Sequence, residues 1–209
     1  MIGLCSAQTR DISFKLACLD TLPSSPKLFI LHFPLRSLPE DPSNYRGEWG
    51  KVFINSRGFG KEFKVKLSHP ALPLFTNPDP TSKPIAVAKI PTNIDECLIV
   101  LAPDAPNNRY LSFPISTKNI PTGSMHVNNL TKHSILLSVG QKKVRIPSHK
   151  HYTFKLAPGA YPTQIFRATH QDKKLEHTSH WVLRENIREL VFFYGEPMRW
   201  KHLAEHSKR

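Results

Sequence analysis

The chain has 209 residues, 39% of them hydrophobic, so it can bury the core of one large or two small domains and bulk disorder is not expected. Its 19 prolines against 9 glycines argue against a helical protein, because proline lacks a backbone N–H and breaks helices. A formal net charge of +13 favours anionic partners such as nucleic acid, anionic lipid, acidic glycans or a charged cell envelope.

The lysines and arginines are dispersed singly or in pairs, as at Lys142-Lys143 and Lys173-Lys174. No recognition-helix, zinc-finger or RNA-recognition signature accompanies them, so no specific nucleic-acid partner is expected. Two interpretations of the charge stay open. One is a solvated basic surface that keeps the protein soluble, and the other is a surface that binds anionic polymers.

The N-terminal segment 1–8 has small residues around Ala7 that resemble the cleavage end of a secretory signal without its apolar region. Either the true start lies further upstream or the similarity arises by chance. A truncated signal peptide predicts a periplasmic or secreted location. No stretch of the chain approaches the roughly 18 to 20 apolar residues that a membrane span requires, so no transmembrane segment is expected.

Alternation of apolar and polar residues predicts short strands in the first half of the chain. From Asp11, the residues Phe14, Leu16 and Cys18 alternate with polar or small residues, which predicts a half-buried first strand. Further strands are expected at 28–33, 52–54, 63–67, 85–88 and 97–101. Segments 34–50 and 71–84 are rich in proline and predict loops, and Gly58-Phe59-Gly60 predicts a hairpin turn.

Residues 120–161 show the same design more clearly. A strand follows Gly123, a turn is expected at Asn128-Asn129, and two further strands follow it. The histidines of this segment are expected to face outward. The apolar residues of the strands are Met125 and Val127, then Ile135, Leu137 and Val139, then Tyr152, Phe154 and Leu156.

Four groups of residues recur in the same order in both halves. The first match is Ser13-Phe14 with Ser112-Phe113, and the second is Leu22-Pro23 with Ile120-Pro121. In the third, Lys66-Leu67, Ala71 and Pro73 match Lys155-Leu156, Ala160 and Pro162. The fourth is Asn93-Ile94-Asp95-Glu96 with Asn186-Ile187-Arg188-Glu189. The sequence therefore predicts two homologous domains, 11–105 and 109–202, with the boundary near Ala102-Pro103-Asp104-Ala105-Pro106.

Each copy carries about six or seven short strands, which is typical of a β-sandwich. A long period with only two copies indicates a tandem pair rather than a solenoid. The predicted fold class is all-β, with two tandem immunoglobulin-like antiparallel β-sandwich domains.

The segment Leu156-Ala157-Pro158-Gly159-Ala160-Tyr161 resembles the Leu-x-Pro-Gly-x-x-Tyr corner of fibronectin-like and immunoglobulin-like sandwiches, where the tyrosine hydroxyl bonds back to the backbone. The spacing here is one residue shorter, so the sequence leaves this hydrogen bond open. In the first copy, Leu72 replaces the tyrosine.

Beyond the corner, the chain resembles a group of uncharacterised bacterial envelope proteins. The resemblance is carried by Ile120-Pro121-Thr122-Gly123-Ser124, Val127-Asn128-Asn129-Leu130-Thr131, Val139-Gly140 and the corner. It covers most of the second half and less of the first. It implies a non-catalytic pair of β-sandwiches exported across the inner membrane, with no catalytic or binding residues to assign.

The three cysteines Cys5, Cys18 and Cys97 form no Cys-x-x-Cys pair and no histidine-flanked pattern, so a thiolate zinc site is not expected. Cys18 and Cys97 both fall on predicted strands. They form either two buried thiols, which is the default expectation, or one disulfide.

Two pairs of histidines have spacings that could suit a metal. His149 and His151 are expected on one face of a strand, but this face continues through Lys155 and is expected to face water. His177 and His180 would meet only on a helix, and a polar loop is expected there. The sequence therefore predicts no metal site.

Aromatic residues are interleaved with cations over residues 194–201, where Arg199 and Trp200 follow Met198. Such a segment could stack on sugars or bases. The preferred interpretation is a final strand whose aromatic residues pack inward.

No nucleophile elbow, glycine-rich phosphate loop, His-Glu-x-x-His motif or carboxylate pair is present in the sequence. We therefore expect a non-enzymatic exported protein that acts as a structural or interaction module in the bacterial cell envelope, with no catalytic residue, cofactor or metal. The expected partner is an unknown protein or an anionic envelope polymer. The alternatives are a polyanion-binding protein for nucleic acid or acidic polysaccharide and a carbohydrate-active enzyme.

Overall fold

The computed structural model describes residues 9–20, 27–32, 48–67, 70–79, 81–104, 109–168 and 173–206. The signal-like segment 1–8 with Cys5, the turn at 22–25 and most of the loop expected at 34–50 lie outside the described residues. None of the helices in the described part of the chain has the length and apolar character needed to cross a membrane.

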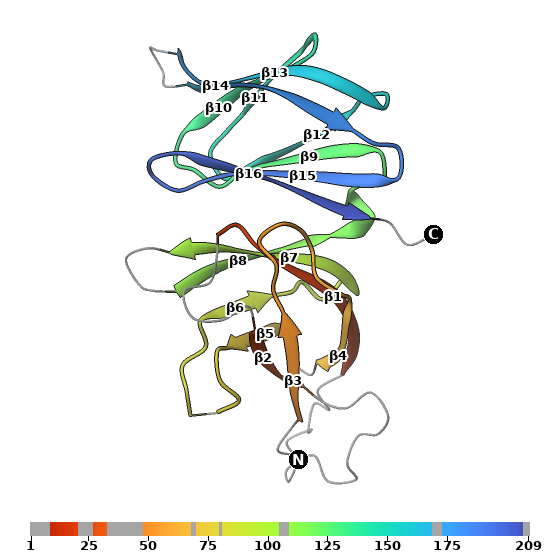
Figure 1. Ribbon diagram of the computed structural model, residues 1–209. Coiled ribbons are helices and arrows are strands. Elements are labelled where there is room, and N and C mark those ends of the chain that lie inside the picture. The colour runs from red at the N-terminus through yellow and green to blue at the C-terminus, as the bar shows by residue number, and fades with distance from the viewer. Residues whose placement is uncertain are drawn as a thin grey trace, which may run out of the picture. The chain divides into compact units, whose positions relative to one another are not determined.

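The described residues are mostly β-strand (Figure 1). The strands are β1 (Arg10–Cys18), β2 (Lys27–His32), β3 (Glu48–Phe53), β4 (Phe63–Leu67), β5 (Ala71–Phe75), β6 (Ala86–Lys89), β7 (Glu96–Asp104), β8 (Arg109–Ser116), β9 (Ser124–Asn129), β10 (Ser134–Val139), β11 (Lys142–Ile146), β12 (His151–Lys155), β13 (Gly159–Ala168), β14 (Lys173–Leu183), β15 (Ile187–Tyr194) and β16 (Arg199–His206). A 3-10 turn spans Thr117–Asn119.

The chain divides into two units, Met1–Lys118 and Asn119–Arg209. In the first unit, one sheet has the strand order β4-β1-β7-β8 and the other has the order β3-β2-β5-β6. Inward-facing residues of both sheets form one apolar core, which includes Phe14, Ile30, Leu72 and Ile99. Each fully buried side chain of this kind contributes about 1.5–3 kcal/mol, so the core holds the two sheets together.

The second unit has one sheet with the order β12-β9-β15-β16 and one with the order β11-β10-β13-β14. Its core includes Met125, Phe154, Trp181 and Phe193, which come from both sheets. The unit is therefore a second sandwich with its own apolar interior.

The two units share one topology, because each strand of the first has a counterpart eight strands later in the second. β1 pairs in parallel with β7, and β9 pairs in parallel with β15. The other paired strands are antiparallel. The all-β fold class with two β-sandwich domains is confirmed, except that each unit contains one parallel pair.

Strand β8 lies in a different unit from the one that the sequence indicated. It pairs antiparallel with β7 from Cys97–Ser116 to Asp104–Arg109, so it completes a sheet of the first unit. The prolines of segment 102–106 suggested a linker, but β7 continues through Pro103 to Asp104. The division falls between Lys118 and Asn119 instead.

Two of the four sequence matches between the halves join positions that are not equivalent in the two units. Ser13-Phe14 lies on β1, whose counterpart is β9, whereas Ser112-Phe113 lies on β8 of the first unit. Leu22-Pro23 follows β1 in the chain, whereas Ile120-Pro121 precedes β9. The match of Lys66 with Lys155 joins the equivalent strands β4 and β12.

The loop predicted at 71–84 contains strand β5, which pairs with both β2 and β6. Leu72 and Leu74 alternate into the core and are fully buried, and this alternation outweighs the prolines around them. The turn at Gly58-Phe59-Gly60 connects β3 and β4, which belong to different sheets, so it is not a hairpin. A Cβ at Gly60 would lie 2.8 Å from the Phe53 carbonyl oxygen, so this crossing needs glycine.

Cys18 and Cys97 are two buried thiols and do not form a disulfide, which decides between the two alternatives. On the parallel pair β1–β7, Cys18 lies opposite Leu101 and Phe14 opposite Cys97, so the thiols are offset by four residues. That offset is roughly 13 Å along a strand, which is too far for a disulfide. Burial raises the pKa of Cys97 to about 12, so this thiol stays protonated.

The corner hydrogen bond that the sequence left open is present. The Tyr161 hydroxyl donates to the Ala157 carbonyl oxygen over 2.7 Å. The ring lies beside Gly140, where a Cβ would come within 3.0 Å of Tyr161 Cδ1. The tyrosine corner therefore forms although its spacing is one residue shorter.

Replacing Tyr161 by phenylalanine is expected to lower the free energy of unfolding by about 1 kcal/mol, because one hydrogen bond is lost and the ring is kept. Urea denaturation measures the change. Tyr110→Phe is the matched control, because the Tyr110 hydroxyl forms no hydrogen bond with any other residue that the structure describes. Equal losses in both variants would contradict a role for the corner bond.

Candidate functional site

The edge strands β6 and β8 of the first unit lie side by side, although they belong to different sheets. The Tyr110 N–H donates to the Ile85 carbonyl oxygen over 2.9 Å. The Ser112 hydroxyl donates to the Val87 carbonyl oxygen over 2.7 Å. These two bonds join the edges of the sandwich along a seam, which we call the β6/β8 seam.

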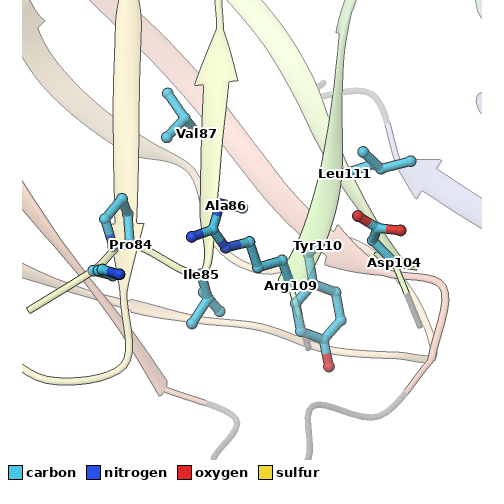
Figure 2. A pocket seen from close by; sticks show the side chains of 9 residues that line it. Pro84, Ile85, Ala86, Val87, Asp104, Arg109, Tyr110 and Leu111 are labelled. Atoms are coloured by element: carbon cyan, nitrogen blue, oxygen red, sulfur yellow. The ribbon is translucent and has the colours of Figure 1, made fainter. Parts of the chain in front are cut away.

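A pocket of about 340 Å³ opens at this seam (Figure 2). Its lining combines apolar residues with a few charged ones: Lys83, Pro84, Ile85, Ala86, Val87, Asp104, Arg109, Tyr110 and Leu111. Ala86 is buried, whereas Val87 and Leu111 are 40% and 52% exposed. The pocket is thus continuous with exposed apolar surface on both strands.

The charged groups of the pocket carry a net positive charge, from Lys83 and Arg109 against Asp104. Asp104 and Arg109 lie opposite each other in the strand register. Figure 2 nevertheless shows the Arg109 side chain extending toward Ala86 on β6, away from Asp104. Among the described residues, neither Lys83 nor Arg109 forms an ion pair.

Tyr110 adds a neutral polar group to the lining. Burial, followed by the negative charges of Cys18 and Asp20 when ionised, raises the pKa of its phenol. The hydroxyl is therefore protonated at neutral pH and can donate a hydrogen bond. Together, these groups suit a molecule that carries an anionic group beside an apolar one.

A polar network in the second unit is built around Asn129, the last residue of β9. Its amide nitrogen donates to the carbonyl oxygens of His133, Ile146 and Pro147 over 2.7, 3.0 and 3.0 Å. Its amide oxygen accepts from the N–H and the hydroxyl of Thr131 over 3.0 and 2.7 Å. Asn129 therefore ties β9 to the start of β10 and the end of β11.

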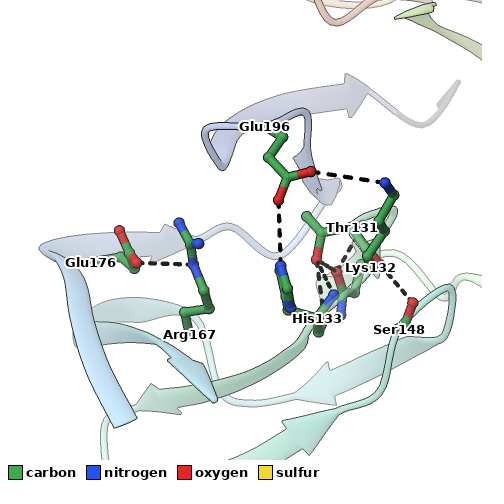
Figure 3. A network of polar contacts seen from close by, with 8 residues as sticks. Thr131, Lys132, His133, Ser148, Arg167, Glu176 and Glu196 are labelled. Atoms are coloured by element: carbon green, nitrogen blue, oxygen red, sulfur yellow. Dashed lines mark hydrogen bonds and ion pairs between the residues drawn. The ribbon is translucent and has the colours of Figure 1, made fainter. Parts of the chain in front are cut away.

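The rest of this network is closer to the surface (Figure 3). Ser148 donates to the Thr131 carbonyl oxygen over 2.7 Å. Glu196 lies 3.5 Å from His133 and 4.0 Å from Lys132. Exposed pairs of this kind contribute about 0–1 kcal/mol, so most of the stabilisation in this network comes from the buried Asn129 amide.

The structure separates the histidines that the sequence paired. His149 lies in a turn with a φ of 55°, so it is not on the strand with His151 as expected. His151 instead contacts His126 on β9, with ring centroids 4.9 Å apart. Nδ1 of His126 lies 2.8 Å from the Thr153 hydroxyl.

His126 is buried, contrary to the outward orientation that the sequence predicted. Burial, followed by the charge of His151, lowers the pKa of His126 to about 4, against a smaller opposite effect of Asn128. No group of three or more histidine, cysteine, aspartate or glutamate residues in the described ranges is placed to hold a metal ion.

His177 and His180 lie on strand β14 rather than in the expected loop. A row of rings crosses from β14 to β16: the centroid distances are 5.2 Å for His177–Trp200, 5.8 Å for Trp181–Trp200 and 6.2 Å for Trp181–His202. At the end of this row, His202 Nε2 lies 2.8 Å from the buried Glu189 carboxylate.

The aromatic and cationic segment 194–201 does not form one surface. Trp200 and Met198 pack against the core of the second unit, the arrangement that the preferred interpretation expected. The Arg199 guanidinium lies over the Tyr194 ring, 5.0 Å from its centroid.

No family model matches the chain, and no curated protein does. Among solved structures, it is similar to a leucine-rich repeat protein from Bacteroides thetaiotaomicron VPI-5482, with 10% identity and a TM-score of 0.19. The match covers 88% of this chain and 26% of the leucine-rich repeat protein, so this chain spans about a quarter of that protein's length.

Proposed function

We propose that this protein is a non-enzymatic exported β-sandwich protein that acts as an interaction module in the bacterial cell envelope. The observation that carries the proposal is the pocket at the β6/β8 seam, because its lining is suited to binding. The resemblance of the second unit to bacterial envelope proteins supports the location.

Fractionation of the native producer tests the location. The protein is expected in the periplasmic or secreted fraction. Recovery in the cytoplasmic fraction, with a cytoplasmic marker enzyme as reference, would count against export.

A second candidate function is binding of an acidic polysaccharide or nucleic acid, which the net charge of +13 favours. Binding of the full chain to heparin should then weaken about tenfold between roughly 50 and 200 mM salt, if about two ionic contacts are made. Fluorescence anisotropy of labelled heparin measures this. Absent or salt-independent binding would remove this candidate.

A further inference from the structure

The second unit fills the seam that corresponds to the β6/β8 seam. β14 and β16 are the counterparts of β6 and β8. Between them lies the row of His177, Trp200, Trp181 and His202 rings. Trp181 is 2% exposed, so this seam is closed by the unit's own aromatic side chains.

The strand register shows which residue of the first unit takes the place of Trp181. Trp181 pairs with Tyr161, and Ala88 pairs with Leu72. Leu72 and Tyr161 are equivalent, because each lies between an alanine and a proline near the start of β5 and β13. Ala88 therefore takes the place of Trp181, but it is fully buried and lies one residue beyond Val87, the last pocket residue on β6.

We propose that the pocket at the β6/β8 seam is a docking site for an extended acidic segment of a partner protein. The segment inserts an aromatic side chain into the pocket and pairs its carboxylates with Lys83 and Arg109. This inference rests on the proposed function as an interaction module.

The size and surroundings of the pocket favour such a segment. Its volume of about 340 Å³ is at the low end for ligand pockets, roughly 300–1,000 Å³, and suits one large side chain. Exposed Val87 and Leu111 provide apolar contacts beside it. Aromatic side chains in pockets dominate many interfaces, and complementary charge speeds association.

A titration of the isotope-labelled full chain, followed by nuclear magnetic resonance, tests the proposal. The probe is a synthetic peptide with one phenylalanine flanked on each side by two aspartates. Saturable shifts are expected for the amides of residues 83, 85–87 and 109–111. Peptides with serine for phenylalanine, or lysine for aspartate, should bind at least about fivefold more weakly.

A matched pair of double variants separates docking from general charge attraction. Lys83→Gln with Arg109→Gln should weaken binding of the peptide at least about fivefold. Lys143→Gln with Arg145→Gln removes the same two charge types from exposed positions on β11 and should change it less than about twofold.

Absence of shifts at the pocket, or equal weakening in both double variants, would overturn the docking proposal. If both double variants still bind heparin, the second candidate function, binding of an anionic polymer, is retained. Fractionation tests export separately, so a failure of the docking proposal can be distinguished from a failure of the proposed location.

Discussion

Replacing Asn129 by alanine is expected to lower the free energy of unfolding by about 3 to 5 kcal/mol. The amide is fully buried, and its nitrogen donates to three carbonyl oxygens while its oxygen accepts from Thr131. Alanine would remove all five of these hydrogen bonds, and each buried group that is left without a partner costs about 1–3 kcal/mol. Urea denaturation followed by tryptophan fluorescence measures the loss.

Two further variants sharpen this test. Asn129→Asp keeps the size and the acceptor but removes the donors, so it should also be strongly destabilising. Asn186→Ala changes an exposed asparagine and should stay within about 0.5 kcal/mol of the parent protein. A loss for Asn129→Ala no larger than for Asn186→Ala would show that the network does not hold the unit together.

The sequence predicted those strands whose alternation was regular. β4 at Phe63–Leu67 has the predicted bounds, because its apolar and charged residues alternate without interruption. β5 was missed and β8 was placed in the wrong half because prolines there suggested loops and a linker. Whether such segments form strands depends on which strands they pair with in the folded protein, and a single sequence does not show this pairing.

The candidate site could not be predicted in the same way. The pocket joins residues 83–87 to Asp104 and 109–111, which come together only when the edges of two sheets meet. Asn129 was expected in a turn, but it is the buried last residue of β9. His126 alternates with core residues and was expected to face solvent, so its burial also depends on packing that alternation does not reveal.

Acidification from about pH 6.5 to pH 4 is expected to remove about 3 kcal/mol of stability through His126. Burial, with a smaller effect of His151, lowers the pKa of folded His126 from 6.5 to about 4. Between these values the unfolded chain binds a proton that the folded chain does not bind. The contribution of neutral His126 is therefore complete above pH 6.5 and is lost progressively as the pH falls toward 4.

Urea denaturation at a series of pH values measures this dependence, with His126→Gln as the reference because glutamine does not titrate. The difference between the two profiles isolates His126 from the carboxylates Asp79 and Asp95, whose pKa values are lowered from 3.8 by hydrogen bonds from Thr81 and Lys118. The parent protein should lose stability more steeply than the variant between pH 6.5 and 4. Parallel profiles, or a His126 resonance that titrates near pH 6.5, would show that the imidazole is not held neutral by its surroundings.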